Sequence, residues 1–110
     1  MRPGRYLAIA LLLSALSACA SVELGSAFDL QAFERGVQRG VTTRTQVQDW
    51  LGAPTSKGVA VESSGQKLEE WIYYHGEGQL PRLSGARLKI LQIRFDADGV
   101  VRSYNWSGGP

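Results

Sequence analysis

Residues Gly40 to Pro54 read GVTTRTQVQDWLGAP, and nearly every position in this stretch has a local structural reason. Thr43 can cap a helix, and Gln46, three residues later, can reach back to complete a capping box. Three apolar residues then fall on one helical face: Val47, Trp50 and Leu51. Gly52 can adopt the left-handed conformation that ends a helix, and Pro54 prevents its continuation. The stretch therefore predicts a short helix with defined ends.

A second short helix is predicted just upstream. Asp29 is a suitable cap, and the residues after it place three apolar side chains on one face: Leu30, Phe33 and Val37. Phe28 and Phe33 flank the cap as a hydrophobic staple would. Gly36 and Gly40 bracket the expected end of this helix.

Beyond Pro54 the residues favour strands. Aromatic and β-branched residues dominate three segments, KLEEWIYYH from Lys67, LKILQIRF from Leu88 and VVRSYNW from Val100. The intervening DADG, Asp96 to Gly99, is a hairpin signal. Two helices followed by these strands predict a two-layer α+β domain, with both helices packed on one face of a three-stranded antiparallel sheet.

The hairpin turn also predicts a register. A type I turn followed by Gly99 in a bulge position pairs Phe95 with Val101 and Arg94 with Arg102. One face of the hairpin then carries the apolar set that should meet the helices: Leu91, Ile93, Phe95 and Val101.

The opposite face would be aromatic and basic, and it is the candidate protein-interaction surface. Its residues would be Ile90 and Gln92 together with the four candidates Arg94, Arg102, Tyr104 and Trp106. Like charges directly opposite each other are unfavourable, so the arginine pair calls for an acidic neighbour or partner. In the alternative interpretation, a nearby carboxylate such as Glu70 or Asp96 neutralises the arginines and the aromatic side chains simply cover the sheet.

The amino-terminal segment has the three-part order of an export signal. Arg2 and Arg5 precede an apolar stretch and a group of small residues. The uncharged run from Tyr6 to Ala18 is 13 residues long, whereas a helix that crosses a bilayer needs about 20 apolar residues. An export signal therefore explains the segment better than a permanent membrane span.

The only cysteine, Cys19, follows this signal directly in the sequence LSACAS. Leu16 to Cys19 resembles the lipobox of bacterial lipoproteins, which implies cleavage before Cys19, diacylation of its thiol and acylation of the new amino terminus. The alternative is an ordinary secretory signal with an incidental cysteine. Exported proteins meet an oxidising compartment where cysteines usually pair, and this chain offers no second cysteine, so lipidation is favoured. Ala20 after the cysteine resembles the outer-membrane sorting pattern of such lipoproteins.

These features divide the chain into a signal peptide (1–18), a lipidated flexible tether (19–27) and a folded domain (28–110). The composition, with 44% hydrophobic and 20% charged residues, suits one small globular domain. Of the 12 basic residues, two leave with the signal, and the remaining ten balance ten acidic ones. No basic run suggests nucleic-acid binding.

Catalysis and metal binding are not expected. His75 is the only histidine; it lies two residues from Glu77 and near Glu69 and Glu70 in sequence. Metal sites usually need three or four convergent ligands, and a hydrolytic site needs a nucleophile activated by a base. We therefore expect neither an enzyme nor a cofactor nor a small-molecule substrate. Zinc binding that depends on His75 would overturn this prediction.

As a whole, Gly40 to Pro54 resembles the G-x-T-x-x-x-V-x-x-x-L-G-x-P signature of the SmpA/OmlA (BamE-like) lipoproteins, with one additional residue between Gly40 and Val47. The lipobox, the Trp71 to Tyr73 strand and the Phe95 to Gly99 turn follow the same order, and the likeness runs from about Phe28 to Tyr104. It implies two helices on a three-stranded sheet and a lipoprotein on the periplasmic face of the outer membrane.

The resemblance also implies a function, that of a non-enzymatic accessory scaffold in β-barrel outer membrane protein assembly and envelope integrity. The known family members carry a Tyr-, Pro- and Gln-Gly-containing segment between the lipid and the first helix, which VELGSAF, from Val22 to Phe28, does not match. Two hypotheses therefore remain open. The protein either associates with the barrel-assembly machinery or is a free-standing periplasmic module that binds or inhibits another protein.

Overall fold

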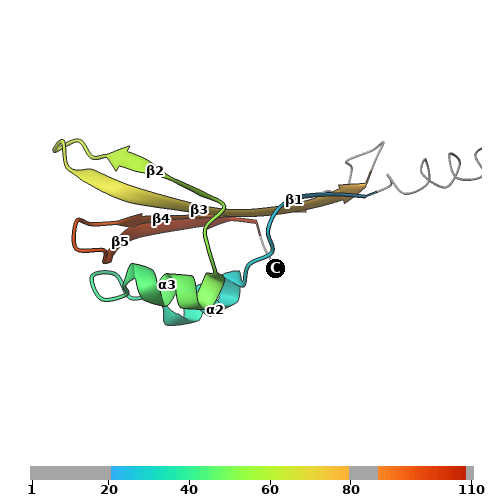
Figure 1. The fold of residues 1–110 in the computed structure, drawn as a ribbon, viewed down its shortest axis with the longest axis horizontal. Helices are drawn as coiled ribbons and strands as arrows, with labels where there is room; N and C mark the ends of the chain where they lie inside the picture. Colours follow the sequence, from blue (N-terminus) through green and yellow to red (C-terminus); the bar gives the residue numbers. More distant parts are fainter. Residues whose placement is uncertain (1–20, 80–86, 109–110) are drawn as a thin grey trace, which may run out of the picture.

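A single antiparallel sheet with two helices on one face makes up the fold in the computed structural model, which describes residues 21–79 and 87–108 (Figure 1). In chain order the elements are β1 (Ser21–Gly25), α2 (Leu30–Gly36), α3 (Arg44–Leu51), β2 (Ser56–Val61), β3 (Lys67–Gln79), β4 (Arg87–Phe95) and β5 (Val101–Ser107). The sheet order is β1-β3-β4-β5, and β2 also pairs with β3. Neither helix of the described residues is long and apolar enough to cross a membrane.

Both helices begin at the caps predicted from the sequence. Asp29 accepts a hydrogen bond from the backbone N–H of Ala32 (3.0 Å), and Thr43 and Gln46 form the expected capping box. Gly52 ends α3 with φ 79° and ψ −168°. This conformation is not the left-handed helical one that the sequence suggested, but it is also a region restricted almost entirely to glycine.

Strand β3 organises the sheet because two strands share one of its edges. β2 pairs with its first half, Lys67 to Ile72, and β1 pairs with its second half, His75 to Gln79. Between them, the Tyr74 backbone N–H donates to the Thr55 hydroxyl (3.1 Å). β4 lies along the other edge of β3 over nine residue pairs, Glu69 to Glu77.

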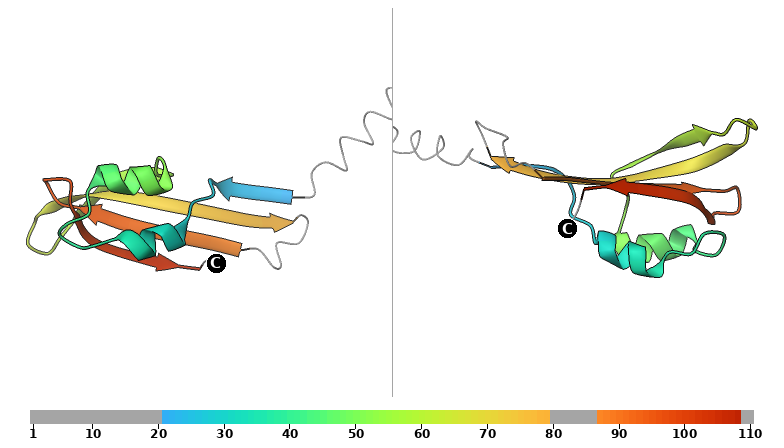
Figure 2. Two further views of the ribbon diagram at one scale, coloured as in Figure 1. Left: turned by 90° about the horizontal axis from the view of Figure 1, so that it is seen from below. Right: turned by 180° about the vertical axis from the view of Figure 1, so that it is seen from behind.

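Both helices pack on the same face of the sheet (Figure 2), and the hydrophobic core lies between the helices and this face. Its buried residues are Phe28, Leu30, Phe33, Val47, Trp71, Tyr73, Leu91, Ile93, Phe95 and Val101. α2 and α3 approach closely at Gly36. The Cβ atom of any other residue at this position would lie 2.8 Å from the Trp50 ring. Glycine at this position therefore lets the Trp50 indole pack directly on α2.

The predicted three-stranded α+β sandwich is wrong, because the sheet has five strands and the described chain is mainly β. β1 occupies residues 21–25, which the sequence suggested were part of a mobile tether, and β2 was not predicted at all. Among the strands of residues 21–79 and 87–108, both pair with β3 alone. Their sequences, SVELG and SKGVAV, contain only two large apolar residues each, so any alternation is too short to identify a strand, and their described side chains are largely exposed. They are held by the free edge of a 13-residue β3 that continues through Gly76 and Gly78.

Candidate interaction surfaces

A β-bulge at the β4–β5 hairpin divides the predicted interaction surface between the two faces of the sheet. Phe95 pairs with Val101, as predicted, but Arg94 pairs with Ser103 instead of Arg102. The extra residue in β5 reverses the alternation of every side chain beyond it. Tyr104 consequently lies opposite Ile93 on the helix side, and the predicted joint surface of Arg94, Arg102, Tyr104 and Trp106 does not form.

The two arginines are neutralised within the molecule. Arg94 Nε lies 2.9 Å from Glu70 Oε2 on the neighbouring strand, which is the pairing that the alternative interpretation anticipated. Arg102 makes two contacts with Glu62, at 2.8 and 3.2 Å. Because exposed ion pairs contribute about 0–1 kcal/mol, these contacts do little for stability, but they remove the need for an acidic partner.

Arg102 and Glu62 also line an open hollow of about 560 Å³ near the β4–β5 turn. The full lining is Arg39, Gly40, Glu62, Asp96, Val101, Arg102 and Ser103. This lining contains equal numbers of basic and acidic side chains, two of each. This balance gives the hollow no preference for ligands of one charge.

Tyr104 and Trp106 form an aromatic pair on the helix side of β5. Their rings stack at 6.0 Å with an angle of 11°, and Tyr104 also meets Phe33 of α2 edge-on at 5.3 Å. Tyr104 is half-buried, whereas Trp106 is 43% exposed. The pair therefore joins the core at one end and reaches solvent at the other.

These aromatic side chains lie at an edge of the sheet, since β5 is the last strand. The loop between α2 and α3 covers only the start of this edge: the Val101 N–H donates to the Thr42 carbonyl, and the Gly40 N–H donates to the Val101 carbonyl, both at 2.8 Å. From Ser103 to Ser107, β4 is the only strand paired with β5 in the part of the chain that the structure describes.

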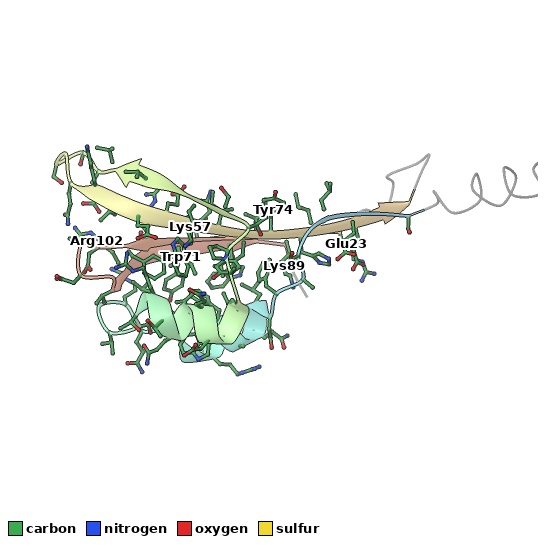
Figure 3. All side chains as sticks on the ribbon, viewed as in Figure 1. Glu23, Lys57, Trp71, Tyr74, Lys89 and Arg102 are labelled. Atoms are coloured by element: carbon green, nitrogen blue, oxygen red, sulfur yellow. The ribbon has the colours of Figure 1, made fainter. Side chains whose placement is uncertain are left out.

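A polar cluster that was not predicted from the sequence connects α3 to the sheet. The Glu69 carboxylate accepts a hydrogen bond from Trp71 Nε1 (2.6 Å) and pairs with Arg44, the first residue of α3. The Trp71 hydrogen bond, supported by Arg44, lowers the pKa of Glu69 below its usual 4.5 although partial burial opposes this. Lys57 of β2 lies 4.9 Å from the centre of the Trp71 ring (Figure 3). The cluster fixes the start of α3 against β3.

His75 lies in a second cluster, between β1 and β3. Its Nε2 atom is 2.8 Å from Glu23 Oε1 and 3.6 Å from Glu77 Oε1, and the three potential metal ligands lie within 4.8 Å of one another. Glu69 and Glu70 lie nearer the start of β3, opposite Phe95 and Arg94, and pair with Arg44 and Arg94 instead.

Two basic residues face this cluster from β4. Lys89 pairs with His75 and Arg87 with Glu77 in the strand register. The Lys89 ammonium group donates to the Phe28 carbonyl (2.7 Å) and lies 4.6 Å from the centre of its ring. The cluster offers three ligands to a divalent cation. The contact of Glu23 with His75 also joins β1 to β3, and we interpret the cluster as a polar link between these two strands.

Cys19, the predicted lipidation site, lies outside the described residues. Within the described residues, the fold and these surfaces define a small, mainly β domain with an open sheet edge at β5 and two polar clusters. No protein-family model matches the chain, and neither the curated proteins nor the solved structures contain a match. The SmpA/OmlA resemblance therefore rests on the sequence motifs alone.

Proposed function

We propose that the protein is a non-enzymatic lipoprotein of the outer membrane that faces the periplasm and binds another protein through the free edge of β5. The signal-like segment and its terminal Cys19 support the anchor and the location. The open edge of β5 supports the binding role.

The observation that carries the binding role is the Tyr104–Trp106 pair on that edge. A free edge strand can accept a further strand through its backbone groups, while neighbouring side-chain contacts give specificity. Aromatic side chains that combine a packed base with an exposed end are typical anchors of protein interfaces. Trp106 meets this description, because it stacks on Tyr104 and remains 43% exposed.

The first candidate partner is the β-barrel assembly machinery, for which the protein would be an accessory scaffold. The Gly40 to Pro54 motif supports this assignment through its resemblance to the SmpA/OmlA signature. One observation favours the second candidate, a free-standing binding or inhibitory module: residues 21–25 form a strand of the sheet, where the family carries a different segment.

Photo-cross-linking from position 106 tests the proposal. A photoreactive phenylalanine analogue would replace Trp106 in the full-length protein in bacterial outer membranes, with Val61 as the matched control position. Val61 is an exposed apolar residue, 65% accessible, on strand β2. We expect a protein adduct at position 106 that is absent at position 61.

The identity of the adduct distinguishes the two candidates. A barrel-assembly subunit would support the scaffold role, and a different periplasmic protein would support the free-standing module. Equal labelling at the two positions would refute binding through the β5 edge.

A further inference from the structure

The sheet continues beyond the helices as a three-stranded extension made of β1, the end of β3 and the start of β4 (Figure 1). On the side of the sheet that faces the helices, the paired residues of this extension whose side chains are described are all ionisable, apart from Gly25 opposite His75. The residues at these positions are Glu23, His75, Glu77, Arg87 and Lys89. Figure 3 shows Glu23 and Lys89 on this side.

The opposite side of the same extension is apolar. Leu24 pairs with Gly76, which in turn pairs with Leu88, so the three residues form one row across the strands. A built Cβ on Gly76 would lie 3.2 Å from Leu88 Cδ1 and 3.8 Å from Leu24 Cβ. The two leucine side chains therefore approach each other over the glycine.

This apolar row is exposed and continues along the sheet. Leu24 is 60% and Leu88 is 53% accessible, among the most exposed large apolar residues of the described chain. The next pair on the same side is Tyr74 with Ile90, both partly buried. The extension is thus amphipathic across its thickness, with a leucine row on one side and charged residues on the other. Such a division suits an element that lies in an interface between water and an apolar phase.

The chain itself indicates which apolar phase this is. Cys19 precedes Leu24 by five residues, and an extended chain of that length spans at most about 18 Å. A lipid attached at Cys19 would hold the leucine row close to the bilayer surface. Apolar faces of interfacial elements are buried about 5–10 Å into the boundary between headgroups and acyl chains, which lies within this reach.

We propose that the helix-free side of this extension lies flat on the bilayer that carries the lipid anchor, with Leu24 and Leu88 inserted between the lipid headgroups. The charged side, with Glu23 and Arg87, faces water. This inference rests on the proposed lipidation of Cys19. It orients the domain: the helices, which lie on the charged side of the sheet, point away from the membrane.

The test uses the full lipidated protein in vesicles of neutral phosphatidylcholine, with an environment-sensitive fluorophore at one position at a time. Because Cys19 is the only native cysteine and its thiol would be acylated, an introduced cysteine can be labelled selectively. Leu24→Cys and Leu88→Cys report on the apolar side. Glu23→Cys and Arg87→Cys are the matched controls, one residue away on the same strands and on the opposite side.

We expect spin-labelled lipids to quench the fluorophores at 24 and 88 severalfold more strongly than those at 23 and 87, and aqueous iodide to show the reverse order. Two positions on each side, with circular dichroism of each variant, guard against a local effect of one substitution. Agreement between the two pairs would support the proposal.

Three results would overturn it. Vesicle-bound protein in which iodide reaches all four positions equally would refute the membrane contact and leave the anchor intact. Shielding of 24 and 88 only in native membranes, and not in pure vesicles, would show that a protein covers this side instead. Protein that does not float with the vesicles at all would refute the lipid anchor and this inference with it.

Discussion

Removal of one hydroxyl group, in the variant Tyr73→Phe, should measurably weaken the attachment of α3 to the sheet. Tyr73 is 2% exposed, and its hydroxyl donates to the carbonyl of Gly52, the residue that ends α3, at 2.9 Å. A hydrogen bond of this kind contributes about 0.5–1.5 kcal/mol, and an acceptor left without a donor adds up to about 1–3 kcal/mol when it is buried. Gly52 is exposed, so water can reach its carbonyl and the lower part of the range applies. We expect a loss of about 1 kcal/mol.

The adjacent tyrosine provides a matched control. Tyr74 is partly buried on the other side of the sheet, and Tyr74→Phe should change the free energy of unfolding by less than about 0.5 kcal/mol. Urea unfolding of the full protein in mild detergent, followed by tryptophan fluorescence, measures both variants. In thermal unfolding of the same variants, the Tm of Tyr73→Phe should fall by about 4–8 °C, because the Tm of a domain of this size shifts by that amount per kcal/mol of lost stability. Equal stabilities of the two variants would refute the role assigned to the Tyr73 hydroxyl.

Three other perturbations have expected outcomes that the same unfolding assay can check. Phe33→Ala removes a fully buried ring, so it should cost about 3–5 kcal/mol, and a loss below about 1 kcal/mol would contradict the position of Phe33 in the core. Gly52→Ala should cost about 1–3 kcal/mol through the backbone alone, since a Cβ there meets no atom within 4 Å; an unchanged midpoint would contradict the φ of 79°. Because the pKa of Glu69 is lowered below 4.5, its carboxylate stabilises the fold above that pH and the contribution is lost as the pH falls through the folded-state value. The free energy of unfolding of Glu69→Gln should therefore fall less steeply with decreasing pH than that of the wild type. Parallel pH profiles of the two proteins would count against the cluster.

The pH dependence of stability in alkali provides a second test of the buried Tyr73 hydroxyl. Burial raises the pKa of its hydroxyl from 10.0 to about 12, so the folded state holds this proton more tightly than the unfolded state. The contribution is complete below pH 10 and is lost as the pH rises toward 12. The stability difference between wild type and Tyr73→Phe should shrink over this range, and a constant difference would contradict the burial of the hydroxyl.

The helices could be predicted from the sequence because their determinants are local. A capping box, a staple and a terminal glycine act within one or two turns, so Thr43, Gln46 and Gly52 specify α3 without knowledge of the sheet. The apolar positions of β4 were equally readable: Leu91, Ile93 and Phe95 alternate with half-exposed residues and are buried.

The number of strands could not be predicted, because β1 and β2 depend on a distant partner. Each is exposed over most of its length and is too short for its side-chain pattern to identify a strand, so the main reason for its conformation is the backbone edge of β3. The predicted strand from Lys67 ended at His75, but β3 continues through the sequence GEG at residues 76–78. There Gly76 leaves room for the leucine side chains on both neighbouring strands.

The candidate surface failed for a different reason, a single extra residue in β5. The turn predicted the pairing of Phe95 with Val101 correctly, but nothing in the local sequence marks Arg102 as the bulge residue. Because side chains alternate with a period of two, that residue moves Tyr104 and Trp106 to the other side of the sheet. Residue types therefore drew attention to Tyr104 and Trp106, while only the register could show which surface they share.

Intact-mass spectrometry of the protein extracted from bacterial membranes tests the lipid anchor most directly. Both the proposed location and the proposed orientation depend on Cys19. We predict a chain that begins at Cys19, without residues 1–18, and carries a diacylglyceryl group on the thiol and a further acyl chain on the new amino terminus. A chain with a free Cys19 thiol, or one that retains residues 1–18, would contradict the anchor.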